Sequence, residues 1–92
     1  MSSIKHYRII VAGKVQGVFF RDSTRKKARE LGIKGIVRNE ADGSVYIEAE
    51  GEAEILAEFL AWCKEGPPLA RVDSLKMEDG PPKKYSSFEI EG

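Results

Sequence analysis

The segment from Gly13 to Arg21, GKVQGVFFR, combines two glycines four residues apart with a single arginine at its end. It joins a β-like run to the expected start of a helix, where backbone N–H groups have no partner within the helix. Gly17 can adopt the positive φ angle that curls successive amides into a concave anion-binding nest. The helix dipole adds partial positive charge at the same place, and the guanidinium of Arg21 can donate two parallel hydrogen bonds. These features predict a binding site for a phosphate group.

The apolar residues of this segment fit the same interpretation. Because the expected donors are main-chain amides, the side chains need not be polar and can turn into the core, where they would hold the loop stiff. The residues concerned are Val15, Val18, Phe19 and Phe20. The segment by itself leaves one alternative open, which is an ordinary strand-to-helix turn with a solvated arginine.

The sequence around this segment predicts the elements that position it. A first strand, HYRIIVAG, consists of β-branched and aromatic residues and ends at Gly13. A helix follows over residues 21–32, and its candidate N-caps are Asp22, Ser23 and Thr24. Its core-facing stripe comprises Phe20, Thr24, Ala28 and Leu31.

The second half of the chain predicts a hairpin, a helix and two more strands. Two alternating runs over residues 33–51 flank Asp42-Gly43, a pair suited to a tight turn. In its second run, Val45, Ile47 and Ala49 would face the core, and Tyr46, Glu48 and Glu50 would face outward. A helix over residues 52–66 ends at Gly66-Pro67-Pro68, because proline cannot continue a helix. Its apolar residues are Ile55, Leu56, Phe59, Leu60, Trp62 and Cys63, and the last two strands cover 69–78 and 86–92.

The order β-α-β-β-α-β, with a short C-terminal strand, is typical of the α+β ferredoxin-like split βαβ sandwich, in which two helices cover one face of an antiparallel sheet. Strands one and two are parallel, a right-handed crossover joins them, and strand three lies between them. Their C-terminal ends therefore lie at one edge of the sheet. This topology brings the 13–21 segment together with Asn39, near the end of strand two. We expect a single domain over residues 1–92.

The composition limits the classes of function. Fifteen Lys and Arg balance fifteen Asp and Glu, which argues against a dedicated nucleic-acid or membrane-surface protein. No apolar run approaches the ~20 residues that span a bilayer, and the N-terminus has no signal-peptide pattern. The only cysteine, Cys63, excludes an internal disulfide and a CxxC metal site. A reducing cytoplasm is therefore the expected compartment.

Several other features predict no chemistry of their own. His6, the only histidine, lies at the start of the first strand, opposite the predicted site, and we expect a surface role for it. Cys63 on an apolar helix face is interpreted as a buried small hydrophobe. The basic run at residues 25–29 is interpreted as a solvated face that steers anionic substrate mildly. Asn39 by itself could be a turn residue ahead of Asp42-Gly43.

Taken together, the two segments resemble the pair of signatures of the acylphosphatase family. The first signature, G-x-V-Q-G-V-x-F-R, matches throughout from Gly13 to Arg21. The second is a G-aromatic-small-basic-N segment that leads to G-x-V and a later glycine, and its matching positions are Gly35, Val37, Arg38, Asn39, Gly43, Val45 and Gly51. Ile36 departs from the aromatic residue that the family usually carries, which we interpret as a packing change beside the site. The predicted order of elements is also the one that the family uses.

The resemblance implies a hydrolase that cleaves the carboxyl–phosphate bond of an acyl phosphate into a carboxylate and inorganic phosphate. Carried over to this sequence, Arg21 binds the phosphate and Asn39 orients the attacking water. The backbone amides that form the phosphate cradle are those of Val15, Gln16, Gly17, Val18, Phe19 and Phe20. No metal or organic cofactor is implied. We expect a monomer whose partners are small molecules: the acyl phosphate is the substrate, and inorganic phosphate is both the product and a competitive inhibitor. Binding to nucleic acid or to a membrane is not expected.

Two other functions are weighed against this one. An RNA-recognition domain has the same topology and stacks bases on exposed aromatics of strands one and three. Tyr46 is a candidate for this role, but strand one offers no matching aromatic residue and the net charge is zero. The other alternative is the phosphatase-like domain of a carbamoyl-transfer maturation factor. The chain ends at Gly92 without a zinc-binding or transferase segment, which favours a free-standing enzyme.

Overall fold

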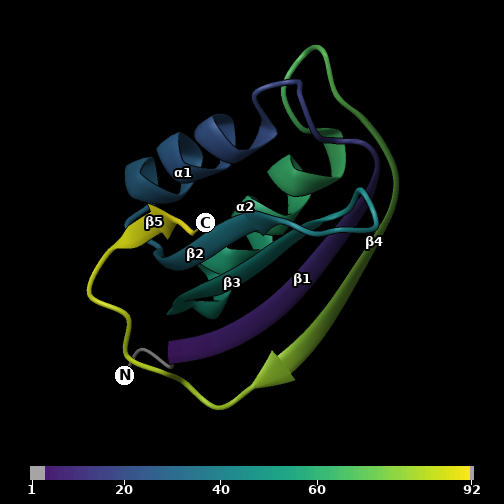
Figure 1. Ribbon diagram of the computed structural model, residues 1–92. Helices are drawn as coiled ribbons and strands as arrows, with labels where there is room; N and C mark the ends of the chain where they lie inside the picture. The colour runs from purple at the N-terminus through teal and green to yellow at the C-terminus, as the bar shows by residue number, and fades with distance from the viewer. Residues whose placement is uncertain (1–3, 92) are drawn as a thin grey trace.

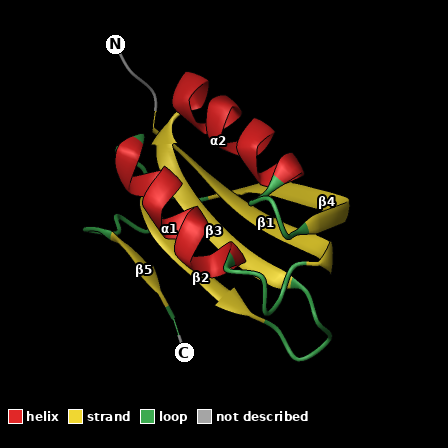
Figure 2. Cartoon of the chain, turned by 90° about the horizontal axis from the view of Figure 1, so that it is seen from above, coloured by secondary structure: helices red, strands yellow, loops and turns green. Residues whose placement is uncertain are grey.

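The computed structural model describes residues 4–91, which form five strands and two helices (Figure 1). The elements are β1 (Ile4–Lys14), α1 (Phe20–Glu30), β2 (Lys34–Asn39), β3 (Val45–Glu52), α2 (Ala53–Glu65), β4 (Arg71–Gly80) and β5 (Phe88–Ile90). β3 lies between β1 and β2 and is antiparallel to both, so β1 and β2 are parallel, as the sequence predicted. Both helices lie on the same face of the sheet (Figure 2). The α+β ferredoxin-like fold is therefore confirmed.

The last strand departs from the prediction of an antiparallel sheet. β4 forms one edge of the sheet beside β1, and β5 lies at the opposite edge, where it runs parallel to β2. The segment 81–87 carries the chain around one end of the sheet between these two strands (Figure 1). Phe88 anchors the new edge, because its buried ring packs edge-on against Phe59 of α2, with 6.1 Å between the ring centroids. The sheet is therefore mixed.

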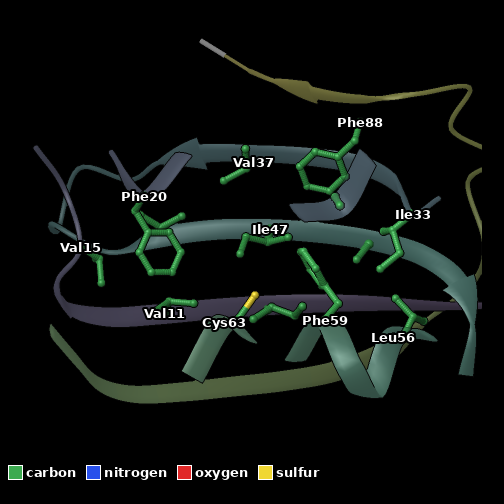
Figure 3. Packing of buried hydrophobic residues seen from close by; sticks show 14 of the residues in the cluster. Val11, Val15, Phe20, Ile33, Val37, Ile47, Leu56, Phe59, Cys63 and Phe88 are labelled. Atoms are coloured by element: carbon green, nitrogen blue, oxygen red, sulfur yellow. The ribbon is translucent and has the colours of Figure 1, made fainter. Parts of the chain in front are cut away.

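The hydrophobic core lies between the sheet and the two helices (Figure 3). The residues of β3 that were predicted to face inward, Val45, Ile47 and Ala49, are completely buried, and so is Cys63. The predicted stripe of α1 is buried at Phe20, Thr24 and Ala28. The residues at the margins of the two predicted helix faces are only half-buried, and these are Leu31, Ile55, Leu60 and Trp62. The periodicity therefore predicted the buried face of each helix correctly, but the predicted face is wider than the observed one.

α1 begins at Phe20, ahead of all three predicted N-caps. Phe19 takes the N-cap position with a left-handed φ of 64°, and its side chain makes no capping hydrogen bond. Asp22 instead lies in the first turn, where its carboxylate interacts favourably with the helix dipole. Thr24 lies inside the helix and its hydroxyl donates to the carbonyl of Phe20, 2.7 Å away. The prediction of a side-chain cap at residues 22–24 was wrong, because the chain turns into the helix through its backbone.

One end of the outward sheet face is covered, which contradicts the prediction that Glu48, Glu50 and His6 lie at the surface. All three are at least 95% buried. The two ring nitrogens of His6 each lie 2.8 Å from a carboxylate oxygen, one of Glu48 and one of Glu50. Glu50 also accepts the backbone N–H groups of Lys83, Lys84 and Tyr85. The carboxylates thus fasten the 81–87 segment over this end of the sheet.

This fastening predicts an acid-sensitive contribution to stability. Burial raises the pKa of Glu50, but the hydrogen bonds from the Lys83 amide and from His6 outweigh it and hold that pKa below its usual 4.5. A carboxyl whose pKa is lowered on folding stabilises the protein above pH 4.5, and this contribution is lost as the pH falls through the folded-state value. We expect Glu50→Gln to lower the free energy of unfolding at neutral pH by about 1–3 kcal/mol, and to weaken its dependence on acid pH.

Urea unfolding measured between neutral pH and acid pH tests this prediction. Glu78→Gln is the matched control, because the Glu78 carboxylate is 74% exposed and lies 3.6 Å from Arg8. An exposed pair of this kind contributes at most ~1 kcal/mol. A Glu50→Gln variant as stable as the parent at neutral pH would contradict the role given to this carboxylate.

Candidate active site

A pocket of about 320 Å³ opens where β1 and β2 end, at the same edge of the sheet. It is lined by Val15, Gly17, Phe19, Phe20, Arg21, Asp22, Asn39 and Ile90. The loop that leaves β1 and the turn that follows β2 lie on the same side of the molecule (Figure 1). The structure thus brings the 13–21 segment and Asn39 together, as the topology predicted.

The loop leaves β1 through a local irregularity. The pairing of β1 with β4 shifts register between Ala12 and Gly13. A side chain at Gly13 would overlap the carbonyl oxygen of Arg71, so only glycine allows this close approach of the two strands. Further along, Gly17 has the predicted positive φ, at 73°. These two positions explain why the segment needs both of its glycines.

The backbone N–H groups of residues 15–20 form an uninterrupted set of donors. Within residues 4–91 none of them donates a hydrogen bond, and the first one at this helix end runs from the Ser23 amide to the Phe19 carbonyl, over 3.0 Å. They stand at the N-terminus of α1, where the helix dipole contributes partial positive charge. A set of unused donors in such a place is suited to an anion.

The side chains of the loop hold its backbone in place. Val15, Val18 and Phe20 are buried as predicted, and the Phe20 ring packs against Trp62 with 5.8 Å between centroids. Val15 and Phe20 lie at the same end of the core (Figure 3). Phe19 was predicted to be buried as well, and this is wrong, because its side chain is 70% exposed. Its left-handed backbone turns the ring away from the core.

Gln16 braces the loop against the β2–β3 turn, a role that sequence reasoning missed. Its Nε2 donates to the carbonyl of Glu40 over 2.8 Å and to the carbonyl of Ser44 over 2.9 Å. Both N–H groups of the side-chain amide are therefore used within the protein. The partners are backbone carbonyls far away in the sequence, so no side-chain pattern could have indicated them.

Arg21 carries an uncompensated positive charge. It is half-buried, lines the pocket and forms neither an ion pair nor a hydrogen bond within residues 4–91. The neighbouring arginines differ from it, because each lies within 4 Å of a carboxylate: Arg25 with Asp22, Arg29 with Glu89, and Arg38 with Glu91. A guanidinium held at a pocket without a protein counter-ion is suited to an anionic ligand.

Asn39 is the last residue of β2 and presents an unsatisfied oxygen. Its Oδ1 is buried and accepts no hydrogen bond from residues 4–91. The β2–β3 turn does not use this side chain, because Asp42 Oδ1 accepts from both the amide and the hydroxyl of Ser44. A buried acceptor without a donor costs about 1–3 kcal/mol, so an oxygen kept in this state indicates a partner from outside the chain.

Apart from the Asp22 carboxylate, which lies 3.6 Å from Arg25, none of the described residues that line this pocket carries an ionisable nucleophile. His6 lies at the far end of β1, and Cys63 lies in the core, where burial raises the pKa of its thiol. Within residues 4–91 no group of three or more His, Cys, Asp or Glu side chains is arranged to hold a metal ion. Neither α1 nor α2 is long and apolar enough to cross a membrane.

The outward face of β3 gives little support to the alternative of an RNA-recognition domain. The hydroxyl of Tyr46 donates to Glu48 over 2.9 Å. The guanidinium of Arg38 lies over the Tyr46 ring, 4.5 Å from its centroid. The face of the one candidate aromatic residue is therefore already in use.

Of the six residues with unused N–H groups, Val15, Gly17, Phe19 and Phe20 line the pocket together with Arg21, whereas Gln16 and Val18 do not. Fold and site therefore define a small α+β protein whose pocket is suited to bind an oxyanion. Comparison with known proteins supplies the family, since residues 7–90 match the family model "Acylphosphatase". The acylphosphatase of Rubrobacter xylanophilus is 53% identical over 77 residues, which are 84% of this chain and 70% of that protein.

Two solved structures agree in fold as well as in sequence. An acylphosphatase from Coxiella burnetii is 41% identical, with a TM-score of 0.92 over 96% of this chain and 93% of its own. An acylphosphatase from Bacillus subtilis is 34% identical, with a TM-score of 0.93 over 98% of this chain and 100% of its own. The chain belongs to the acylphosphatase family, and it is a hydrolase with acylphosphatase activity.

Proposed function

We propose that this pocket binds the phosphoryl group of an acyl phosphate and directs a water molecule onto its phosphorus. Arg21 and the amides of residues 15–20 contact the phosphoryl oxygens, and Asn39 orients the water. The observation that carries the proposal is the buried, unpaired Oδ1 of Asn39 in the same pocket as the unpaired Arg21. Donors, cation and acceptor are the parts that the hydrolysis of a phosphate anhydride requires.

The chemistry of the substrate explains why so few groups suffice. An acyl phosphate is a mixed anhydride, and its leaving group is a stabilised carboxylate. The water oxygen forms a bond to phosphorus, the bond from phosphorus to the acyl oxygen breaks, and the carboxylate leaves with the electron pair. Asn39 cannot take up the proton of the water, because a carboxamide is not a base near neutral pH. A phosphoryl oxygen of the substrate accepts this proton instead. Catalysis then consists of positioning and charge stabilisation.

The charge stabilisation comes from a rigid set of donors. Attraction between unit charges ~4 Å apart is about 4 kcal/mol at an effective dielectric constant of ~20. The half-buried Arg21 can supply an attraction of that order, because no protein carboxylate within residues 4–91 neutralises it. The amides add hydrogen bonds that need no reorganisation, since buried side chains on either side of Gly17 fix the loop. The steps assigned to these residues need no metal ion and no organic cofactor.

This arrangement predicts that inorganic phosphate competes with the substrate. Phosphate presents the same oxyanion to Arg21 and the amides, so millimolar phosphate should raise the apparent KM for benzoyl phosphate and leave kcat unchanged. Initial rates measured at several concentrations of substrate and of phosphate give both the apparent KM and kcat. A control series with chloride at equal ionic strength separates binding from screening. A rate that does not respond to phosphate would contradict the proposed cradle.

Two further expectations concern the setting of the enzyme. Cys63 is a free, buried thiol, which is compatible with a reducing cytoplasm. The cytoplasmic compartment and the monomeric, free-standing state remain predictions from the sequence.

A further inference from the structure

Phe19 is an exception among the apolar residues beside the pocket. Its side chain is 70% exposed, whereas those of the neighbouring Val18 and Phe20 are 5% and 1% exposed. It also lines the pocket together with Arg21 and Asn39. A large ring that contacts both the cavity and the solvent lies at the mouth of the pocket.

The conformation of Phe19 adds a second unfavourable feature. Its φ is 64°, in the left-handed region that phenylalanine rarely adopts. The exposed ring also forgoes the burial that stabilises most phenylalanines in folded proteins. Strained residues of this kind persist where the surrounding structure enforces them, and they cluster at ligand-binding sites. Backbone strain and exposure together indicate that the ring contacts a ligand.

The proposed reaction geometry indicates which part of the ligand it contacts. In phosphoryl transfer the attacking and leaving oxygens lie roughly in line on opposite sides of the phosphorus. In the proposed geometry the attacking water is held by Asn39 at the inner wall of the pocket, because Oδ1 of Asn39 is buried. The acyl group, as the leaving group, therefore points outward to the mouth of the pocket, where the Phe19 ring is exposed.

We propose that the Phe19 side chain is the binding surface for the acyl group and favours acyl phosphates with an aromatic or extended apolar acyl group over acetyl phosphate. This inference rests on the proposed function of the pocket. A planar acyl group that lies against the ring would cover apolar surface on both partners, and aromatic pairs gain further from offset or edge-on contact. An acetyl group is too small to cover the ring. Phe19 thus determines specificity through its side chain, while its amide belongs to the cradle.

The test compares acetyl phosphate with benzoyl phosphate, which share the phosphoryl group and differ in the acyl group. The readout is the ratio of kcat/KM for benzoyl phosphate to kcat/KM for acetyl phosphate. We expect Phe19→Asn to lower this ratio by about tenfold, the scale on which a hydrophobic contact discriminates substrates. Asparagine tolerates the left-handed conformation, so the variant removes the ring and keeps the backbone. Changes in the cradle affect both substrates alike and cancel in the ratio.

Two variants provide the controls. Phe19→Tyr keeps an aromatic ring and should retain the ratio of the parent. Leu69→Asn removes a side chain that is 65% exposed but does not line the pocket, and should leave the ratio unchanged. If turnover of Phe19→Asn is too slow to measure, the same ratio is read by calorimetry from the binding of benzoylphosphonate and acetylphosphonate.

A ratio within twofold of the parent's in an active or binding-competent Phe19→Asn variant overturns the role of the ring. A failure of the proposed function has a different signature, in which Arg21→Ala still releases phosphate from both substrates at a rate within tenfold of the parent's. A fall in the ratio that occurs equally in Leu69→Asn would also overturn the inference, since it would show a general surface effect.

Discussion

Arg21→Ala is expected to lower kcat/KM for benzoyl phosphate by about 10³–10⁵, the range over which an arginine stabilises phosphoryl transfer. The guanidinium is half-buried at the pocket and has no carboxylate partner within residues 4–91, so its full charge is available to the phosphoryl oxygens. Because it forms no ion pair or hydrogen bond there, its removal should change the melting temperature little. Initial-rate measurements of phosphate release, together with thermal unfolding, separate the two effects.

Two variants sharpen the interpretation of Arg21→Ala. Arg25→Ala removes an arginine one turn further along α1 that is paired with Asp22 at 3.6 Å, and it should stay within a few-fold of the parent. Arg21→Lys keeps the charge but loses the planar donor pair, and should recover only part of the activity. An Arg21→Ala variant within tenfold of the parent would refute the assignment of the phosphate site.

The position of the site could be predicted because it depends on topology more than on contacts. Parallel β1 and β2, joined by a right-handed crossover, must end at the same edge of the sheet. From that rule alone we predicted that Asn39 lies beside the 13–21 segment, although Asn39 is 18 residues away from Arg21 in the sequence. Gly17 was predictable for a similar reason, since a left-handed turn is an intrinsic preference of glycine and needs no knowledge of its neighbours.

The errors concern properties that only the neighbours decide. The alternation of β3 placed Glu48 and Glu50 correctly on the outward face but said nothing about what covers that face. The cover comes from the aperiodic 81–87 segment and from His6 on β1, which meet the carboxylates through long-range contacts. The exposure of Phe19 also depends on its surroundings. The path of the loop imposes a left-handed φ on Phe19, although phenylalanine by itself disfavours that conformation.

Asn39→Ala should lower kcat by about 10²–10³, the usual loss when one preorganised group is deleted from a site of this kind. Removal of Oδ1 leaves the water without its acceptor, while Arg21 and the amides still hold the phosphoryl group. The competitive inhibition constant of phosphate should therefore stay close to that of the parent. Stability should not fall, because an oxygen that is buried without a donor costs free energy in the folded state.

Gln16→Ala is the matched comparison for Asn39→Ala. Both residues carry a side-chain carboxamide beside the pocket, but Gln16 uses its N–H groups in hydrogen bonds within the protein, whereas Oδ1 of Asn39 has no partner within residues 4–91. Nε2 of Gln16 donates to the carbonyls of Glu40 and Ser44, so Gln16→Ala removes two hydrogen bonds that hold the loop against the β2–β3 turn and loosens the loop. The two carbonyls keep their backbone donors, which are the amides of Gly43 and Glu40. We expect Gln16→Ala to lower the melting temperature and to weaken phosphate binding, whereas Asn39→Ala lowers kcat alone. If Asn39→Ala destabilises the protein as much as Gln16→Ala does, or leaves kcat within tenfold of the parent, then Asn39 is a structural residue and the water must be oriented by another group.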